Sequence, residues 1–338
     1  MDITLTQMRY FVEAAGRLSM TGAAERLNVA QSAVSAAVSH LERRIGSQFF
    51  IRQRSKGLVL TPAGEMFLRD AQAILAQLEE ALDHARGEQQ SISGRVRLVC
   101  FSTLAPFLLP GLLGRLHLEH PDLLVEVTEA DAAGCSAALL SGQADLALCY
   151  DLGLREGLSV TAVDESLPHL VLPPEHRLAG RAEVALAELS DEPFVLLDLP
   201  HSRELMLSIL RQAGIEPEVR FRSASYETVR AFVANGHGYS ILHQRPQHGL
   251  TYDGGRVATV AVQGPVPVLR TVLAHPQTQR TTARLRAVAH AVRQQVAARG
   301  RAQAASGAEP IRGRAGPALA QADAAAGIRT SPPDPTSR

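Results

Sequence analysis

The stretch from Leu18 to Leu60 limits the possible folds of this chain more than any other part of its sequence. It holds two helical patterns of small and apolar residues, the first with Ala23, Ala24 and Leu27 and the second with Val34, Val38 and Leu41. Asn28 lies between them, at a corner where Asn adopts a left-handed backbone at little cost. Because small residues let two helices approach closely, and because Ser19 and Thr21 can cap the first helix, this stretch predicts a helix-turn-helix.

The outward face of the second helix is short, polar and almost uncharged. A helix with such a face can enter the major groove of DNA and offer hydrogen bonds to the bases. We expect Gln31 to read a base edge, and Ser32 and Ser35 to contact bases or phosphates. The full set of expected contacts from the two helices is Thr21, Gln31, Ser32, Ser35 and Ser39. Taken alone, a pair of Ala-rich helices is weak evidence, because many all-α proteins contain one.

Two strand-like runs follow the second helix, over residues 49–60, and they flank a turn at Gly57 that is rich in Arg and Lys. We interpret this hairpin as a wing, and we assign Arg52, Arg54 and Lys56 to phosphates or to the minor groove. The wing, its basic turn and the proline-led helix after it make a plain all-α protein a poor explanation of this region.

Residues 5–65 closely resemble the amino-terminal domain of LysR-type transcriptional regulators. The signature segments are FV at 11–12, AAERL at 23–27, QSAVS at 31–35, LERRIG at 41–46, FFIR at 49–52 and LTPAGE at 60–65. The resemblance implies a winged helix-turn-helix that binds double-stranded DNA. Two residues depart from the family pattern. Ala30 stands where the family often has Ser, so a helix cap worth roughly 1 kcal/mol is expected to be missing. Ala36 stands where Arg is frequent, which removes a DNA contact.

The formal net charge of the chain is zero, with 34 basic and 34 acidic residues, but the charges are unevenly distributed. Residues 1–60 contain eight Arg or Lys against four Asp or Glu, whereas residues 61–90 contain two against six. A basic module is therefore followed by an acidic helix, and the sum over the whole chain hides both.

Residues 61–90 are expected to form one long helix that links the DNA-binding domain to the rest of the chain. Thr61 and Pro62 give a helix start, and Glu65 follows in the first turn. An apolar seam runs along this helix, formed by Met66, Phe67, Ala71, Ile74, Leu75, Leu78 and Leu82. We interpret the seam as a dimer contact, with packing on the helix's own chain as the alternative. The family resemblance favours the dimer, and a dimer of helix-turn-helix units predicts a palindromic operator.

Beyond a break at residues 89–94, strand-like and helical segments alternate up to about residue 298. This alternation predicts an α/β domain with a mostly parallel sheet and helices on both sides. The strands suffice for two lobes, with the last strand and helix returning to the first lobe. The region resembles the two-lobed effector-binding domain of LysR-type regulators, which is similar to periplasmic binding proteins. The segments that carry the resemblance are ST at 102–103, LSGQADLAL at 140–148 and VANGHGYS at 233–240.

The expected organisation is a winged helix-turn-helix at 1–60, a linker helix at 61–90, an effector domain at 91–298 and a tail at 299–338. Within the effector domain, lobe I would comprise about 91–163 and 267–298, and lobe II about 164–266. The tail consists largely of Ala, Gly, Pro, Arg and Ser without periodicity, so we expect it to be disordered. Its six Arg against three acids allow weak contact with DNA, although an inert tail is the simpler interpretation.

In open α/β lobes, ligands bind at the carboxyl ends of strands, where helix amino termini offer free N–H groups. Three stretches of this kind occur, at 102–103, 201–203 and 223–228. We expect a small-molecule effector to contact Ser102, Thr103, His201, Ser202, Arg203, Ser225 and Asn235. For each hydroxyl the alternative role is to cap its own helix. Arg203 favours an anionic effector such as a carboxylate, unless its side chain is merely solvated.

The sequence carries none of the motifs that would indicate an enzyme, a metal site or a bound cofactor. A Gly-x-Ser-x-Gly elbow, a His-Glu-x-x-His pair and a phosphate loop are absent, and the histidines lack metal-ligand spacing. Cys100, Cys135 and Cys149 fit neither a disulfide framework nor a zinc pattern. Cys100 and Cys149 end two strands of one lobe, where they are either packing residues or a redox switch.

The first residues lack a signal-peptide pattern and no segment is long enough to cross a bilayer, so we expect a cytoplasmic protein without a membrane partner. Together these observations predict a LysR-type regulator that self-associates as a dimer or tetramer, responds to a small effector and contacts RNA polymerase. A DNA-binding protein without effector response is the alternative, and an α/β ligand carrier or enzyme fits less well. The sequence leaves open the effector, the target genes and whether transcription is activated or repressed.

Overall fold

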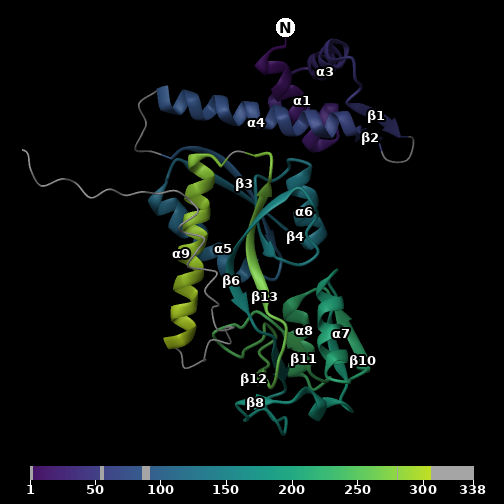
Figure 1. Cartoon of the computed structure of the whole chain (residues 1–338), viewed down its shortest axis with the longest axis vertical. Helices are drawn as coiled ribbons and strands as arrows, with labels where there is room; N and C mark the ends of the chain where they lie inside the picture. The colour runs from purple at the N-terminus through teal and green to yellow at the C-terminus, as the bar shows by residue number, and fades with distance from the viewer. Residues whose placement is uncertain (1–2, 54–56, 86–91, 280, 306–338) are drawn as a thin grey trace, which may run out of the picture.

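The chain is arranged along one long axis in the computed structural model, which describes residues 3–53, 57–85, 92–279 and 281–305. A small helical module with a hairpin lies at one end, a long helix crosses beneath it, and two α/β lobes follow (Figure 1). The helix-turn-helix and the second lobe therefore lie at opposite ends of the molecule.

The amino-terminal module is built from α1 (Leu5–Arg17), α2 (Met20–Leu27) and α3 (Gln31–Ile45). Ser19 caps α2, because its Oγ accepts a hydrogen bond from the Gly22 N–H at 3.0 Å. Asn28 has a φ of 54°, so the left-handed corner predicted from the sequence is confirmed. The predicted apolar stripe is also confirmed, since Val34, Val38 and Leu41 are at most 2% exposed.

Helix α3 begins at a residue that cannot cap it. Ala30 occupies the N-cap position with φ −68° and ψ 138°, and it makes no side-chain capping hydrogen bond, as expected from the sequence. Further along α3, Glu42 Oε1 accepts hydrogen bonds from the N–H groups of Phe49 and Phe50, at 2.7 and 3.2 Å. These two bonds fix the beginning of the hairpin against the helix.

The hairpin consists of β1 (Phe50–Gln53) and β2 (Gly57–Leu60), which pair antiparallel and confirm the predicted wing. Gly57 was expected at the turn, but it is the first residue of β2 and pairs with Gln53. Arg52 lies in β1, where only its backbone is described, and Arg54 and Lys56 fall outside the described residues. The expected phosphate contacts of the wing therefore stay predictions.

Helix α4 (Pro62–Ala85) begins where the sequence predicted, and Thr61 Oγ1 accepts from the Gly64 N–H at 3.0 Å. Buried Leu68 and Ala71 join α4 to the amino-terminal module, together with a stacked Phe49–Phe67 pair whose ring centroids are 4.6 Å apart. Other apolar residues of α4 are exposed: Met66, Ile74 and Leu82. Because successive residues turn by about 100°, the residues of the predicted seam spread over roughly half of the helix circumference. The contact with the amino-terminal module therefore buries only some of them.

Lobe I contains a five-stranded sheet in the order β4-β3-β5-β13-β6. The strands are β3 (Gly94–Phe101), β4 (Leu123–Ala130), β5 (Leu146–Tyr150), β6 (Leu158–Ser166) and β13 (Leu269–Pro276). Strand β3 is parallel to β4 and β5, whereas β13 is antiparallel to β5 and β6. The sheet is thus more mixed than expected, because β13 returns from lobe II in the opposite direction. Strand β6 was not predicted, since its sequence is largely polar and it lies at the edge.

Three helices cover the sheet of lobe I: α5 (Ala105–Glu119), α6 (Ala132–Leu140) and α9 (Ala283–Ala305). Helices α5 and α9 pack together, and α6 lies on the other side of the sheet (Figure 1). Helix α9 runs to Ala305, so the prediction of a disordered tail is wrong for residues 299–305. The continuation follows from packing: Arg299 and Gln303 donate to the Arg245 carbonyl oxygen at 3.2 and 3.3 Å. Residues 306–338 fall outside the described part of the chain.

Lobe II contains the sheet β11-β7-β12-β8 and the parallel pair β10-β9. Its strands are β7 (His169–Leu172), β8 (Glu183–Val184), β9 (Phe194–Leu197), β10 (Val219–Ser223), β11 (Ser240–Leu242) and β12 (Ala258–Val262). Its helices are the 3-10 turn η1 (Leu186–Leu189), α7 (Ser202–Gln212) and α8 (Tyr226–Ala234). The chain crosses between the lobes twice, from β6 to β7 and from β12 to β13, as predicted.

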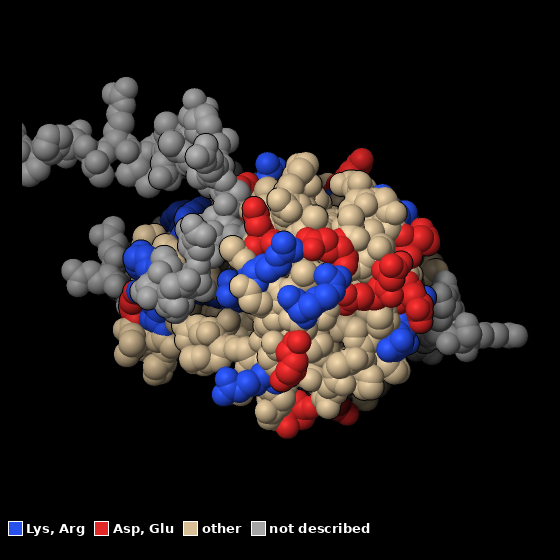
Figure 2. All heavy atoms as spheres, turned by 90° about the horizontal axis from the view of Figure 1, so that it is seen from below, with Lys and Arg blue, Asp and Glu red and all other residues tan. Residues whose placement is uncertain are grey.

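The end of lobe II farthest from the helix-turn-helix carries basic and acidic side chains next to one another (Figure 2). Ion pairs of this lobe include Arg177–Glu192 at 3.1 Å and Arg181–Glu188 at 2.7 Å. Within the described ranges, no helix is both long and apolar enough to span a membrane, and no group of three or more His, Cys, Asp or Glu is arranged to hold a metal ion.

Candidate nucleic-acid interface and effector pocket

The outward face of α3 presents the polar residues expected to contact DNA. Gln31 and Ser32 are exposed, Ser35 and Ser39 are half-buried, and Thr21 is exposed on α2. The Gln31 Nε2 group donates to Ser35 Oγ at 3.0 Å, so the amide lies along the helix in this state. To reach a base edge, Gln31 would exchange this weak surface bond for one to DNA.

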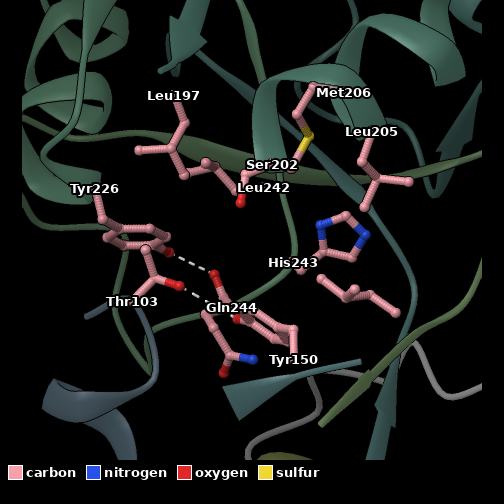
Figure 3. Close-up of a pocket in the computed structure, with 11 residues that line it drawn as sticks. Thr103, Tyr150, Leu197, Ser202, Leu205, Met206, Tyr226, Leu242, His243 and Gln244 are labelled. Carbon is pink, nitrogen blue, oxygen red and sulfur yellow. Dashed lines mark hydrogen bonds between the residues drawn. The ribbon is translucent and has the colours of Figure 1, made fainter. Parts of the chain in front are cut away.

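A pocket lies between the lobes, and both lobes contribute side chains to it (Figure 3). Its polar lining residues are Thr103, Tyr150, Ser202, Tyr226, His243 and Gln244. Its apolar lining residues are Leu197, Leu205, Met206, Leu242 and Leu269. The empty space among these residues is about 310 Å³, which includes the part that opens to solvent. Most of them stand where a strand ends or a helix begins, which is where ligands bind in open α/β sheets.

Hydrogen bonds fix two tyrosines at one side of the pocket. The Thr103 hydroxyl donates to the Tyr150 hydroxyl at 3.3 Å, and the Tyr226 hydroxyl donates to the Gln244 carbonyl oxygen (Figure 3). Burial raises the pKa of Tyr150 to about 12, so this hydroxyl stays protonated at neutral pH. Behind the pocket, Arg299 of α9 donates to the Gln244 side-chain oxygen.

His243 is the pocket residue with buried polar atoms that lack partners. Its side chain is 8% exposed, and neither ring nitrogen has a hydrogen-bond partner among the described residues. Burial lowers the pKa of His243 to about 3, so its imidazole is neutral near pH 7. His169 lies on the neighbouring strand, opposite Leu242, and burial lowers its pKa to about 3 as well.

The structure brings two of the expected effector residues into the pocket. Thr103 and Ser202 line it, and each is 6% exposed. Ser102 is half-buried beside the pocket but does not line it, and its N–H donates to the Ala130 carbonyl oxygen at 3.0 Å. His201 is exposed and has a φ of 63° at the residue before α7, where the chain turns into the helix.

The other three expected residues do not reach the pocket. Arg203 forms ion pairs with Asp198 at 2.9 Å and Glu204 at 3.1 Å, and it does not line the pocket. Ser225 caps α8, accepting from the Thr228 N–H at 3.3 Å, which is the alternative role considered for it. Asn235 follows the carboxyl end of α8, whereas Tyr226 at the beginning of this helix lines the pocket. The length of the helix therefore separates Asn235 from the pocket. The expected anionic effector therefore loses the residue on which it rested.

Sequence reasoning missed Tyr150, Tyr226, His243 and Gln244. A signal for them was present, because Tyr150 ends β5, and His243 and Gln244 directly follow β11. The strand-end rule, applied to every strand, indicates Tyr150, His243 and Gln244. Tyr226 is instead the first residue of α8, inside the predicted stretch 223–228.

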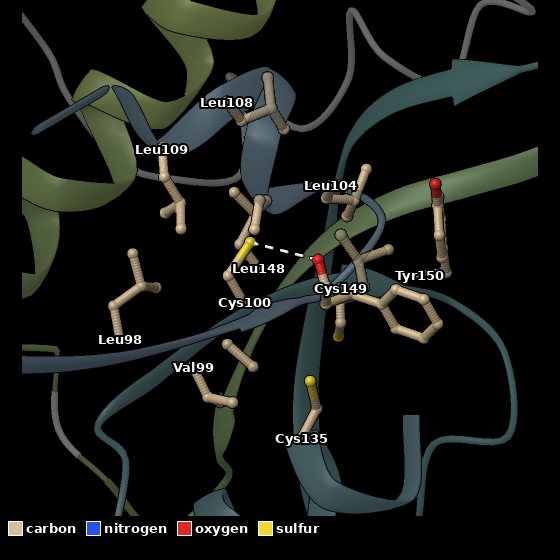
Figure 4. Close-up of a cluster of buried hydrophobic side chains, with 14 of the residues drawn as sticks. Leu98, Val99, Cys100, Leu104, Leu108, Leu109, Cys135, Leu148, Cys149 and Tyr150 are labelled. Atoms are coloured by element: carbon tan, nitrogen blue, oxygen red, sulfur yellow. Dashed lines mark hydrogen bonds between the residues drawn. The ribbon is translucent and has the colours of Figure 1, made fainter. Parts of the chain in front are cut away.

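The three cysteines lie together in the core of lobe I (Figure 4). Cys100, Cys135 and Cys149 are all free thiols and fully buried. Burial raises the pKa of the Cys100 thiol, and a hydrogen bond with Cys135 together with burial raises that of Cys149. Because the thiolate is the reactive form, these two residues favour the packing role over the redox switch.

Both parts of the chain match known families. Residues 5–65 match the bacterial regulatory helix-turn-helix protein, lysR family, and residues 89–297 match the LysR substrate binding domain. The chain is 32% identical over 274 residues to the probable hydrogen peroxide-inducible genes activator of Streptomyces viridosporus, covering 80% of this chain and 87% of the relative. It is 31% identical over 248 residues to the uncharacterized HTH-type transcriptional regulator YnfL of Escherichia coli (strain K12), covering 72% and 82%.

A solved structure shows the same arrangement. The crystal structure of HinK, a LysR family transcriptional regulator from Pseudomonas aeruginosa, aligns with a TM-score of 0.59 and 34% sequence identity. The alignment covers 87% of this chain and 99% of the HinK chain. This chain thus belongs to the LysR family, as a DNA-binding transcriptional regulator that has an effector-binding domain and is not an enzyme.

Proposed function

We propose that the DNA occupancy of this regulator responds to a small molecule held between lobes I and II. The observation that carries the proposal is the composition of the pocket: Thr103 and Tyr150 come from lobe I, whereas Ser202 and His243 come from lobe II. A ligand that contacts both lobes binds one arrangement of them more tightly than another. Differential contact of this kind is what allows a ligand to shift an equilibrium.

A Ser202→Ala variant tests the effector response, with Ser208→Ala on the same helix as its matched control. Ser202 lines the pocket, whereas Ser208 Oγ donates to the Leu205 carbonyl oxygen and does not line it. Footprints on the upstream DNA of the protein's own gene, with a panel of metabolites, identify a compound that changes protection. We expect Ser202→Ala to weaken the response while effector-free binding persists. An unchanged response would remove Ser202 from the site.

At the DNA, we propose that Gln31 reads a base edge and that Ser32, Ser35, Ser39 and Thr21 contact bases or phosphates. The exposure of Gln31 on α3 supports this assignment. Gln31→Ala should reduce the preference for operator over random DNA, with Gln77→Ala on exposed α4 surface as the control. Equal preference in Gln31→Ala and wild type would exclude Gln31 from base reading.

For the wing, we propose that Arg52, Arg54 and Lys56 bind phosphates or the minor groove. Their replacement by Ala should weaken binding to all DNA sequences alike. Each lost phosphate contact should also flatten the slope of log affinity against log salt concentration by about 0.9. A triple Ala variant with an unchanged slope would contradict the assignment.

We further propose that the protein works in the cytoplasm as a homodimer or homotetramer on a palindromic operator, with RNA polymerase as a partner. Exposed Met66 and Ile74 on α4 support self-association through this helix, since large apolar side chains gain by mutual burial. Sedimentation of Met66→Glu/Ile74→Glu against wild type tests it, and an unchanged mass would exclude α4 as the contact. We also propose that residues 1–60, 61–90 and 91–305 form separate units, the last extended beyond the expected 298 because α9 runs to Ala305.

A further inference from the structure

We propose that the effector of this regulator is an uncharged molecule with an apolar body and a polar group that both donates and accepts a hydrogen bond, and that His243 binds this group. The inference rests on the proposed function, because it names the chemical class held by the same pocket. It replaces the anionic effector that the sequence suggested.

The lining of the pocket carries no formal charge. Its eleven residues include neither Arg nor Lys, and neither Asp nor Glu. A carboxylate that entered such a site would lose its hydration without gaining a counter-ion, which is strongly unfavourable. An uncharged ligand loses far less hydration free energy when it enters the same site.

Two cations close to the pocket, Arg203 and Arg299, already have partners. Arg203 is held by Asp198 and Glu204 outside the lining. Arg299 donates to the Gln244 side-chain oxygen and to the Arg245 carbonyl oxygen, and its guanidinium lies 4.5 Å from the centroid of the Phe107 ring. To bind an anion, Arg299 would have to give up these contacts behind Gln244.

Helix amino termini give the strongest argument for an anion, but those at this pocket are largely occupied. At the start of α7, the Ser202 N–H donates to the Pro200 carbonyl oxygen at 2.8 Å, and the Arg203 N–H donates to the Leu199 carbonyl oxygen at 2.9 Å. At the start of α8, Ser225 already accepts from Thr228. These groups are therefore not free to cradle a carboxylate.

His243 supplies the positive part of the argument. Its ring projects among Leu205, Met206 and the other lining residues in Figure 3. A neutral imidazole has one donor and one acceptor nitrogen, and both nitrogens of His243 are buried and unpartnered among the described residues. Because unpaired buried polar atoms destabilise a protein, a ligand that pairs with them gains affinity. A hydroxyl or a primary amide can donate to one nitrogen or accept from the other.

The rest of the lining fits an apolar body. Leu197, Leu242 and Leu269 join Leu205 and Met206 around the space, and Tyr150 and Tyr226 add aromatic surface. A ring or a short branched chain therefore suits the pocket better than a sugar or a phosphate ester.

The first experiment compares matched probes on the full wild-type chain, by ligand-detected NMR at pH 7.5. Benzyl alcohol and benzamide are the neutral probes, and benzoate is the charged one of the same size. We expect benzoate to bind at least about tenfold more weakly, because it is buried without a counter-charge. Tighter or equal binding of benzoate overturns the inference, and so does the absence of binding by both neutral probes.

The second experiment assigns the contact, using His243→Leu and, as control, His248→Leu, whose side chain is exposed outside the pocket. Circular dichroism establishes that both variants are folded. We expect His243→Leu to lose the preference for benzyl alcohol and benzamide over toluene, and His248→Leu to keep it. If His243→Leu keeps that preference, His243 is not the contact.

The same probes separate this inference from the proposed function. Preference for benzoate refutes the uncharged class and leaves an effector response intact. Neutral probes that bind through His243 without changing the footprint support the class and count against the response of DNA binding to this pocket.

Discussion

At the scale of single residues, the buried histidines of lobe II couple the stability of the fold to pH. His169 and His243 have pKa values lowered to about 3 from 6.5, mainly by burial. For His169, the charges of Arg245 and Arg230 and a charged His243 lower the pKa further. Since the folded pKa lies below the unfolded one, the stabilisation is complete above about pH 6.5 and is lost as the pH falls towards 3.

We therefore expect the free energy of unfolding of lobe II to decrease by roughly 2 kcal/mol per histidine between pH 7.5 and pH 5. A His169→Leu/His243→Leu variant should lose most of this dependence, whereas His290→Leu, altered at an exposed site, should keep it. Urea unfolding at both pH values measures the difference. The same decrease in all three proteins would mean that other groups cause the acid sensitivity.

The cysteines give a second prediction at this scale. One relative is named as a probable hydrogen peroxide-inducible genes activator, but in this chain all three thiols are buried and none lines the pocket. Because burial holds Cys100 and Cys149 as thiols, we expect Ellman's reagent to modify the native protein negligibly and the denatured protein fully. Mass spectrometry after peroxide treatment provides an independent check. Rapid modification of the cysteines in the native protein would instead support the redox switch.

At the scale of elements, α3 has a fully buried apolar face but no side-chain cap at its amino terminus. Ala30 leaves the first amides of α3 without a side-chain acceptor. Ala30→Ser should slow hydrogen exchange in α2 and α3 and stabilise the module by about 1 kcal/mol. Ala33→Ser, which places the same hydroxyl inside the helix, is the control and should give no such gain. Equal effects of the two changes would contradict the capping explanation.

Helix α9 reaches across to the segment that follows β11. Arg299 joins α9 to Gln244 and Arg245, and its guanidinium also stacks on Phe107. Arg299→Lys keeps the charge but loses the planar fork, so we expect a destabilisation of about 1–3 kcal/mol and weaker binding in the pocket. Arg293→Lys, on the exposed side of α9, should change neither quantity in thermal unfolding and probe titrations. An inert Arg299→Lys would exclude this contact from shaping the pocket.

At the scale of the whole molecule, a small joint connects α4 to lobe I. The Gly142 carbonyl oxygen accepts from Gln72 Nε2 and from Arg97 Nη1, both at 2.6 Å. Arg97 is in turn paired with Asp145 at 2.6 Å. A movement of lobe I can therefore reach α4, which carries the helix-turn-helix through Leu68 and the stacked Phe67.

We expect Gln72→Leu to reduce the change that an effector makes in the DNA footprint, without weakening effector-free DNA binding or binding in the pocket. The reason is that the substitution removes the hydrogen bond from Gln72 to the Gly142 carbonyl oxygen of lobe I. It changes no residue that is expected to contact DNA and none that lines the pocket. Gln77→Leu, at an exposed position of the same helix, is the control. Equal footprint changes in both variants would mean that coupling runs by another route.

The sequence by itself determined those features that local patterns encode. The 3.6-residue period fixed the apolar face of α3, the left-handed preference of Asn28 fixed the corner, and Thr61 with Pro62 fixed the start of α4. The two lobes and their two crossovers followed from the alternation of strands and helices, together with the family resemblance. For the helix face, the corner and the helix start, the residues involved are neighbours in the chain, so short-range preferences decide the outcome.

The tertiary structure alone decided which side chains meet. Thr103, Ser202 and His243 are far apart in sequence and share one pocket, whereas Arg203, next to Ser202, is turned to Asp198 and Glu204. Arg299 begins a segment that has the composition of a disordered tail, but it is held in α9 by partners more than fifty residues away in the chain. The direction of β13 likewise depends on the return from lobe II. Such contacts depend on how distant elements pack, and local propensity carries no information about that packing.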